Sequence, residues 1–295
     1  MNKTFIEFRK QRDFSSILSD TFGFIRNEFK PFIKTIFNVA GPAIVIFMLS
    51  LAAYNYVIGD ISNFTSFGNS SFGTSNILVI IVAVVVYLIS AITAYILTVS
   101  TALFYIKSYV DNKGVVDESE VKANVYKAFW SFFGLSFLKG ITVGFAAALC
   151  IFPVFYAMVP MAIVFSIFVF EPKRSWSDAY SQSFTMVNID FWTAFGSFFV
   201  LGIIYYLLGL VFSIPTVIYT LISTGIFSGE IDPSNLSSFS ADPVIIVLNV
   251  LNTFFQFVLN LILVVGGAVI YFHLHEKTNF TGTYDRINEI GKIED

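Results

Sequence analysis

The sequence predicts an all-α, polytopic membrane protein with six transmembrane helices and amphipathic helices at the cytoplasmic interface. Three observations lead to this prediction. The 295 residues are 56% hydrophobic and only 13% charged, whereas soluble domains are nearer ~25% charged. Six long apolar stretches alternate with polar connections. Basic residues are confined to alternate connections, as expected when successive helices cross a membrane in opposite directions.

The amino-terminal segment, residues 1-31, is expected to be cytoplasmic. It is polar, and it lacks the short apolar run with a small-residue cleavage site that marks a signal peptide. Apolar residues recur within it at helical spacing, which predicts an amphipathic helix that ends before Pro31. The residues of this face are Phe14, Ile17, Leu18, Thr21 and Ile25.

The six-helix transmembrane domain is expected over residues 32-273, with a cytoplasmic tail over 274-295. A helix needs about 20 residues to cross the hydrocarbon, and the fourth stretch is at the low end of the usable range. We expect a turn at Pro153, and a bend at Pro215 or a protruding end in the fifth stretch. The stretches are Phe32–Ile58, Ile77–Tyr105, Phe129–Phe152, Val154–Phe170, Phe191–Ile226 and Val244–Phe272.

The distribution of charge predicts the orientation. Sixteen of the seventeen basic residues lie in the amino-terminal segment and its junction with the first stretch, in the second and fourth connections, and in the tail. The other connections, Gly59 to Asn76 and Phe227 to Pro243, carry none, and neither does the turn at Pro153. By the positive-inside rule both termini are expected in the cytoplasm.

A second amphipathic helix is predicted directly after the fourth stretch. Ser175 is a suitable N-cap, with Asp178 in the first turn near the positive end of the helix. Asn188 and Asp190 are expected to end the helix before the next apolar stretch, so that it lies in the membrane interface. Its apolar face comprises Trp176, Ala179, Tyr180, Ser183, Phe184 and Val187.

An internal repeat is suggested by two matching motifs. Phe129-Trp130-x-x-Phe133-Gly134 matches Phe191-Trp192-x-x-Phe195-Gly196, and each follows a polar, helix-forming stretch. The run Phe29 to Phe32 is a degenerate third copy. The pattern predicts a possible three-fold repeat of an amphipathic helix plus a membrane hairpin. The alternative is that aromatic residues simply gather at every membrane interface.

Several of these segments together resemble a known family. The run Ile151 to Tyr156, Phe170-Glu171, the stretch Ser175 to Phe184, and Phe191-Trp192 are similar to bacterial integral membrane proteins labelled "glycerophosphoryl diester phosphodiesterase membrane domain". The resemblance implies six helices in a bacterial inner membrane and no established activity, because the phosphodiesterase barrel is not in this chain. Ala179, Ser183 and Met186 match the family's amphipathic-helix positions, whereas Val154 replaces the usual glycine of the turn.

The sequence does not favour an enzyme. His273 and His275 bracket Leu274 where the last stretch ends, and only Glu276 is adjacent as a further ligand. Interfacial anchoring is therefore expected, with no metal and no cofactor. The sequence contains neither a glycine-rich phosphate loop nor a nucleophile elbow. We expect no nucleic-acid partner.

Two polar features inside the apolar stretches are candidate sites. Lys139 lies well inside the third stretch, where it could extend to the headgroups or contact an anion or lipid. Four amides of the sixth stretch are spaced three or four residues apart and therefore share one helix face. They could bond neighbouring helices, or line a polar pathway or partner face. This amide stripe comprises Asn249, Asn252, Gln256 and Asn260.

Stripes of small residues predict where helices approach closely. One lies in the second apolar stretch and one in the third. The first stripe is Ser90, Ala94, Thr98 and Ala102, and the second is Gly140, Gly144 and Ala148.

Two classes of function remain open. The favoured one is a non-catalytic scaffold or accessory subunit of a bacterial inner-membrane assembly. The alternative is a transporter or lipid-handling protein that uses the amide stripe, because weak repeats and proline-interrupted helices are typical of transporters. The expected partners are the lipid bilayer and a membrane protein or a second copy of the chain.

Overall fold

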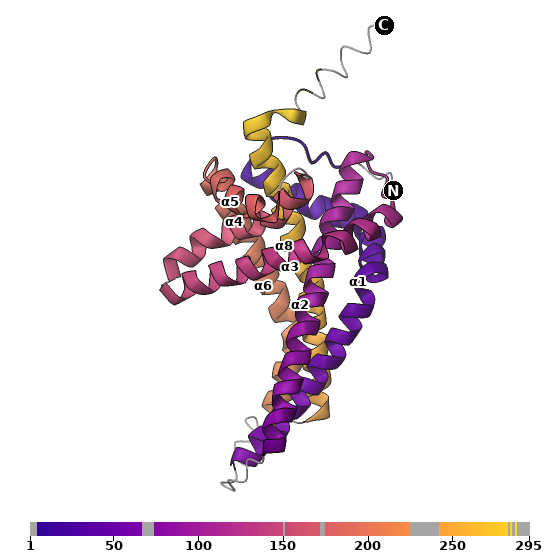
Figure 1. Ribbon diagram of the computed structural model, residues 1–295, viewed down its shortest axis with the longest axis vertical. Helices are drawn as coiled ribbons and strands as arrows, with labels where there is room; N and C mark the ends of the chain where they lie inside the picture. The colour runs from indigo at the N-terminus through magenta and orange to yellow at the C-terminus, as the bar shows by residue number, and fades with distance from the viewer. Residues whose placement is uncertain are drawn as a thin grey trace. The chain divides into compact units, whose positions relative to one another are not determined.

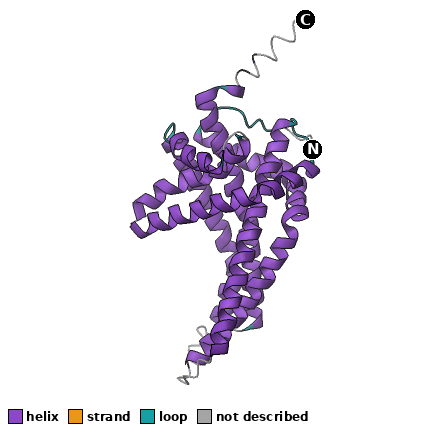
Figure 2. Cartoon of the chain, in the orientation of Figure 1, coloured by secondary structure: helices purple, strands orange, loops and turns teal. Residues whose placement is uncertain are grey.

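The chain is helical almost throughout in a computed structural model (Figure 2), which describes residues 5–66, 74–149, 151–171, 175–224, 242–282, 284 and 287. Within these ranges there are seven helices and no strand. Six of them, all except α5, are long and apolar enough to span a membrane. The all-α prediction is confirmed, and the chain has the helices of a multi-pass membrane protein. The helices, labelled in Figure 1, are α1 (Phe14–Ser66), α2 (Thr74–Asp111), α3 (Glu118–Leu149), α4 (Ile151–Phe170), α5 (Trp176–Val187), α6 (Phe191–Ser223) and α8 (Pro243–Asn279).

The predicted amino-terminal amphipathic helix and the first apolar stretch form a single helix, α1. The helix continues through Pro31 without a break. Phe24, Phe32 and Ile36 are all buried, so one apolar face runs across the proline. Burial of that face outweighs the backbone hydrogen bond that the proline removes. The predicted helix end before Pro31 is therefore wrong, and the expected boundaries at 31 and 273 both fall inside helices.

The hairpin of α3 and α4 turns earlier than predicted. The helices are separated by residue 150 alone, which lies outside the described residues. Pro153 is the third residue of α4 rather than part of the turn. Proline is tolerated there because backbone N–H groups of a first helical turn have no intrahelical partner. At its other end α3 begins at Glu118, so the polar stretch before Phe129 belongs to the same helix.

The local signals around α5 are confirmed, but its buried face is shifted. The side chain of Ser175 accepts a hydrogen bond from the Asp178 N–H at 3.2 Å, and Asp178 accepts one from the Ser175 N–H at 3.1 Å. This reciprocal pair is a capping box. Trp176, on the predicted apolar face, is 42% exposed and lies beside Gly134 of α3. The helix packs against α3 and α4 and buries Ala179, Ser183, Met186 and Val187.

The two small-residue stripes differ in burial: the one in α2 packs against another helix, and the glycines of the one in α3 do not. In α2 all four residues of the stripe are buried, and the Ser90 hydroxyl lies 2.6 Å from that of Ser50 in α1. In α3 a Cβ atom added at Gly140 or Gly144 would meet nothing within 4 Å. The close approach predicted for α3 is therefore wrong for these two glycines.

The chain forms two compact units. The first unit comprises Met1–Val39, Ile96–Tyr205 and Leu261–Asp295, and the second comprises Ala40–Tyr95 and Tyr206–Asn260. An aromatic cluster lies in the core of the first unit, with ring centroids 5.1 to 6.4 Å apart; it contains Phe8, Phe24, Phe32, Tyr105 and Tyr109. In the second unit, aromatic contacts join α1 to α2 and α8, and α6 to α8.

Contacts within the first unit favour the three-fold repeat. Gly134 of the α3 motif faces Trp176, the first residue of α5. Gly196 of the α6 motif faces Phe14, the first residue of α1. Lys34 is the equivalent position in the degenerate copy, and it forms a 3.9 Å ion pair with Glu118, the first residue of α3. Each motif therefore contacts the start of the next amphipathic helix, and the third contact returns to the first.

The buried faces of these three amphipathic helices are also equivalent. The fourth residue of each helix is fully buried, and so is the eighth. An N-cap side chain precedes each helix, and Asp13, Asp117 and Ser175 all accept backbone N–H bonds of the first turn. The buried residues are Ile17, Val121 and Ala179 at the fourth position, and Thr21, Val125 and Ser183 at the eighth.

Candidate functional site

The amide stripe of α8 lies in the second unit, on the side of the helix directed at α6. All four amides are half-buried. A Cβ atom built on Gly209 of α6 would lie 3.9 Å from Cγ of Gln256. Val247 and Leu251, on the other side of α8, are 57% and 48% exposed. The stripe is therefore covered in part by α6, whereas the apolar side chains face outward.

Little of the hydrogen-bonding capacity of the stripe is used. Gln256 Nε2 donates to Asn252 Oδ1 at 3.3 Å, a bond within α8 itself. Neither Asn249 nor Asn260 has a hydrogen-bond partner within the described part of the chain. The interhelical bonds expected from the packing interpretation are thus not formed among the described residues. Amide groups at membrane depth without protein partners favour contact with water or a polar ligand.

Helix α6 brings hydroxyl groups to the same level. Gly209 lies beside Gln256, and the Tyr219 hydroxyl donates to Asp242 Oδ2 at 2.8 Å, so the two helices run antiparallel in a fixed register. This register sets Ser213 and Thr216 at the level of Asn252 and Asn249. The hydroxyl of Thr216 is buried and has no hydrogen-bond partner among the described residues. Amides and hydroxyls of two adjacent helices can together bind a polar group through both donors and acceptors.

Lys139 lies in the first unit and contacts an aromatic ring of the neighbouring helix. The side chain is half-buried, and Nζ lies 5.3 Å from the ring centroid of Phe165 in α4. A cation over an aromatic face is stabilised by the ring quadrupole. Lys139 therefore has an interhelical protein contact that neither of the two sequence-based interpretations included.

A buried histidine joins three segments of the first unit. The backbone N–H of Arg12 donates to Nδ1 of His273 at 3.0 Å. Because Nδ1 accepts, the proton of the neutral ring is on Nε2, which lies 3.2 Å from Asp190 Oδ2 and donates to it. Lys277 Nζ donates to the same carboxylate oxygen at 2.5 Å. His273 is 1% exposed, so the interfacial anchoring expected from the sequence is wrong for this residue.

The electrostatics of this cluster keep Asp190 ionised. Burial opposes ionisation, but hydrogen bonds from Lys277, Thr193 and His273 outweigh it and lower the pKa of Asp190 to about 2. The result is a fixed negative charge between the end of α5 and the start of α6. This charge faces two side chains of α8, the neutral imidazole of His273 and the ammonium group of Lys277.

Other buried polar pairs in the first unit also escaped the sequence analysis. The Tyr105 hydroxyl of α2 donates to Glu28 of α1 at 2.9 Å. The fully buried Arg12 side chain pairs with Asp20 at 2.8 Å and donates to the carbonyls of Glu7, Phe8 and Lys10. Nothing in their local sequence separates a buried polar group from an exposed one.

The described residues contain no group of three or more histidine, cysteine or acidic side chains placed to hold a metal ion. The amide stripe and the buried histidine cluster are the two arrangements of polar side chains that could carry a function. Comparison of the chain with protein-family models, with curated proteins and with solved structures finds no match.

Proposed function

We propose that the protein is a non-catalytic, multi-pass membrane protein that handles a polar or amphiphilic ligand along the amide stripe of α8. One observation carries the proposal. Asn249 and Asn260 lie half-buried on the α6-facing side of α8 without hydrogen-bond partners in the described chain, at the level of α6 residues that carry hydroxyls. Unused donors and acceptors inside hydrocarbon are costly unless they bind water or a ligand.

Cysteine accessibility tests this proposal without knowledge of the ligand. In a chain whose native Cys150 is replaced by Ser, Asn252→Cys should react with a charged, membrane-impermeant thiol reagent. The adjacent Leu251→Cys is the matched control, because Leu251 faces outward and should be shielded by lipid. Equal protection of both cysteines would rule out a hydrated stripe. Reaction at Leu251→Cys alone would place the water on the wrong face of the helix.

A second candidate function is a scaffold or accessory subunit of a membrane assembly. One face of α3 favours it, because apolar residues recur there every four residues and are 52% to 66% exposed; they are Phe137, Ile141, Phe145 and Leu149. Such a face suits a neighbouring transmembrane helix as well as lipid. A stoichiometric partner recovered in mild detergent, and lost with Phe137→Ala and Phe145→Ala together, would favour the scaffold. Retention of the partner by that variant would remove this support.

We further propose a bacterial inner-membrane location with both termini in the cytoplasm. The confinement of basic residues to alternate connections supports the orientation, and the family resemblance of the sequence suggests the membrane. Cysteine probes at Ser70 and Ser238, which lie outside the described residues, should label from outside the cell. Probes at Ser119 and at Lys292, the latter also outside the described residues, should not label. Labelling at Ser119 from outside would overturn the topology.

A further inference from the structure

The α3–α4 hairpin differs from the other two hairpins, α1–α2 and α6–α8, in its length and in its turn. Its second helix, α4, has 20 residues, whereas the equivalent helices α2 and α8 have 38 and 37. From Gly144 to Phe155, on both sides of the turn, the sequence contains no charged, amide or hydroxyl side chain. Phe152, beside the turn, is 84% exposed. A turn of this composition suits hydrocarbon rather than water.

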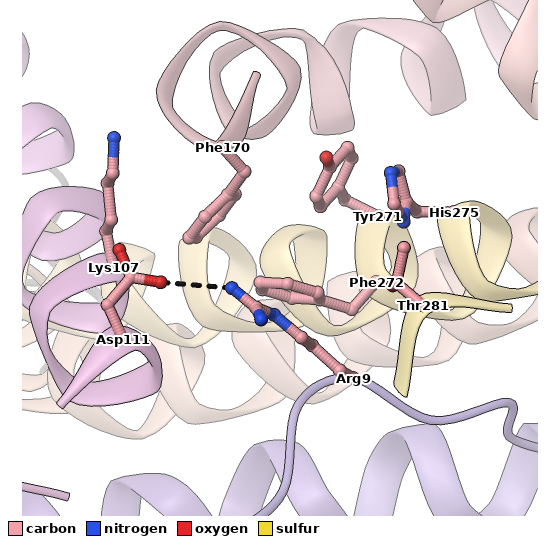
Figure 3. Close-up of a pocket in the computed structure, with 8 residues that line it drawn as sticks. All are labelled: Arg9, Lys107, Asp111, Phe170, Tyr271, Phe272, His275 and Thr281. Atoms are coloured by element: carbon pink, nitrogen blue, oxygen red, sulfur yellow. Dashed lines mark hydrogen bonds and ion pairs between the residues drawn. The ribbon is translucent and has the colours of Figure 1, made fainter. Parts of the chain in front are cut away.

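The end of α2, the start of α6 and the end of α8 lie together in the first unit. Asp190, the residue before α6, bonds His273 and Lys277 of α8. The ends of α2 and α8 line one pocket of about 240 Å³ beside Arg9 (Figure 3). Because all three helices are long and apolar enough to cross a membrane, these ends mark one membrane boundary. From α2 and α8 the pocket is lined by Lys107, Asp111, Tyr271, Phe272 and His275.

Helix α4 has both of its ends at this boundary. Its last residue, Phe170, stacks on Tyr271 with ring centroids 5.3 Å apart (Figure 3). Near its other end, Tyr156 stacks on Phe191, the first residue of α6, at 5.6 Å. Tyr156 and Phe170 are about 21 Å apart along the helix axis, and the hydrocarbon is about 30 Å thick. A crossing helix would place one of them far from the boundary, so α4 lies along it.

Helix α5 covers one side of the hairpin with a polar surface. It packs against both α3 and α4. The Tyr180 hydroxyl lies 2.7 Å from that of Thr142 in α3, and the Tyr156 hydroxyl of α4 donates to Asn188 at 3.3 Å. The covered side of the hairpin therefore faces water, as expected beneath an interfacial amphipathic helix. The exposed polar residues of α5 are Ser177, Asp178, Ser181 and Thr185.

The exposed surface of α3 is apolar along the hairpin. Every exposed residue from Phe133 to Leu149 is Phe, Ile, Leu, Ala or Gly. Lys139 is consistent with a hairpin that lies along the boundary. It precedes the turn by about 16 Å of helix, so a crossing hairpin would place it near the middle of the hydrocarbon, where a cation is costly. Along the boundary it lies at the level of the headgroups.

We propose that the α3–α4 hairpin does not cross the bilayer but inserts the apolar face of α3 among the acyl chains of one leaflet. The chain then crosses the membrane through α1, α2, α6 and α8, and its two termini lie on the same side. The apolar turn and the polar cover of α5 on the other side favour lipid as the occupant of this face. The leaflet is cytoplasmic in the orientation proposed above, and only that assignment rests on the orientation.

Spin labels on the full-length chain in lipid bilayers test this arrangement, because relaxation by oxygen and by a water-soluble nickel chelate reports the depth of each label. In a Cys150→Ser chain, single cysteines are placed at exposed positions of α3 spaced four residues apart. All labels should lie in the acyl chains at one depth, within about 5 Å. A crossing hairpin would instead move successive labels by about 6 Å along the membrane normal. The substitutions are Phe137→Cys, Ile141→Cys, Phe145→Cys and Leu149→Cys.

The matched control is a set of exposed α2 positions with the same spacing, Leu78→Cys, Val82→Cys and Val86→Cys, which should show the 6 Å steps of a crossing helix. The same steps in α3 would overturn the proposal. So would α3 labels that only the chelate reaches, which lie in water, or labels shielded from both agents, which lie against a protein partner. A flat profile relaxed by an impermeant chelate from outside the cell would support the hairpin and refute the proposed orientation.

Discussion

The two units of the chain treat polar side chains differently. In the first unit, charged and polar groups pair over long sequence distances: Arg12 with His273, His273 with Asp190, and Glu28 with Tyr105. In the second unit, hydroxyls mostly donate to their own helix, and two amides of α8 bond nothing in the described chain. The first unit is therefore specified by its polar pairs, whereas the second keeps hydrogen-bonding capacity available for a ligand.

Two glycines, one in each unit, differ in the space around them. A Cβ atom on Gly267, in the first unit, would lie 2.7 Å from the Ala162 carbonyl oxygen of α4. A Cβ atom on Gly209, in the second, would meet nothing closer than Gln256 Cγ at 3.9 Å. A methyl group therefore fits at Gly209 but not at Gly267, and Gly140 and Gly144 of the first unit are open as well.

The largest effect is expected from Arg12→Ala. It removes a buried guanidinium that pairs with Asp20 and satisfies backbone carbonyls. Breaking a buried pair in this way costs about 3–5 kcal/mol, so the free energy of unfolding measured in detergent should fall by that amount. Arg26→Ala, at an exposed position of α1, should be nearly neutral. Similar losses in both variants would show that the polar pairs do not specify the first unit.

The second effect is expected from Asp190→Asn, and it depends on pH. Because the folded-state pKa of Asp190 is lowered to about 2 from 3.8, its stabilisation is fully present above the unfolded value and is lost as pH falls toward 2. Asp190→Asn should therefore be less stable than the native chain at pH 6, by about 1 kcal/mol, because solvent screens part of the interaction. The two proteins should converge near pH 2 in chemical unfolding. A difference that persists at pH 2 would mean that the charge of Asp190 is not what stabilises the cluster.

Alanine substitutions at the two glycines should change the free energy of unfolding in opposite directions, and the change at Gly209 is the smallest expected. Gly267→Ala should lower the free energy of unfolding by about 1–3 kcal/mol, because the methyl group meets a backbone oxygen. Gly209→Ala should raise it by about 0.5–1 kcal/mol, because alanine is the better helix former and the site has room. Both changes can be measured by thermal unfolding in the same detergent. A change in the same direction in both variants would contradict the difference in packing between these two positions.

Signals that act within one helical turn were predictable from the sequence. Ser175 was predicted as the N-cap of α5, with Asp178 in the first turn, because capping acts over three residues; the structure adds that the two residues bond each other reciprocally. Pro31 was misinterpreted because the local cost of a proline is known, but the burial that offsets it comes from distant residues such as Tyr105. The stripes in α2 and α3 look alike in sequence, yet only the α2 stripe is buried. A small residue permits close approach without supplying a neighbouring helix.

The candidate site, too, was predictable only as far as local spacing reaches. The spacing of Asn249, Asn252, Gln256 and Asn260 predicted one shared face, since helical periodicity is local. Which neighbour that face meets, and whether its amides are satisfied, depends on the register between α6 and α8. Lys139 was recognised as unusual, but its contact with Phe165 requires a second helix. The pocket beside Arg9 unites residues from both ends of the chain, and no local pattern indicates it.

The sequence by itself determined the class of protein, the number of apolar helices and some of their ends, such as Phe170 and Phe191, because hydrophobicity, helical period and capping act over a few residues. The tertiary structure decided which polar groups are buried, which glycines touch another backbone and which donors remain available. Those properties depend on groups brought together from distant segments, as in the bond from Gln11 to the Glu276 carbonyl, 265 residues away. Burial and hydrogen bonding are properties of the assembled neighbours, and only the fold supplies them.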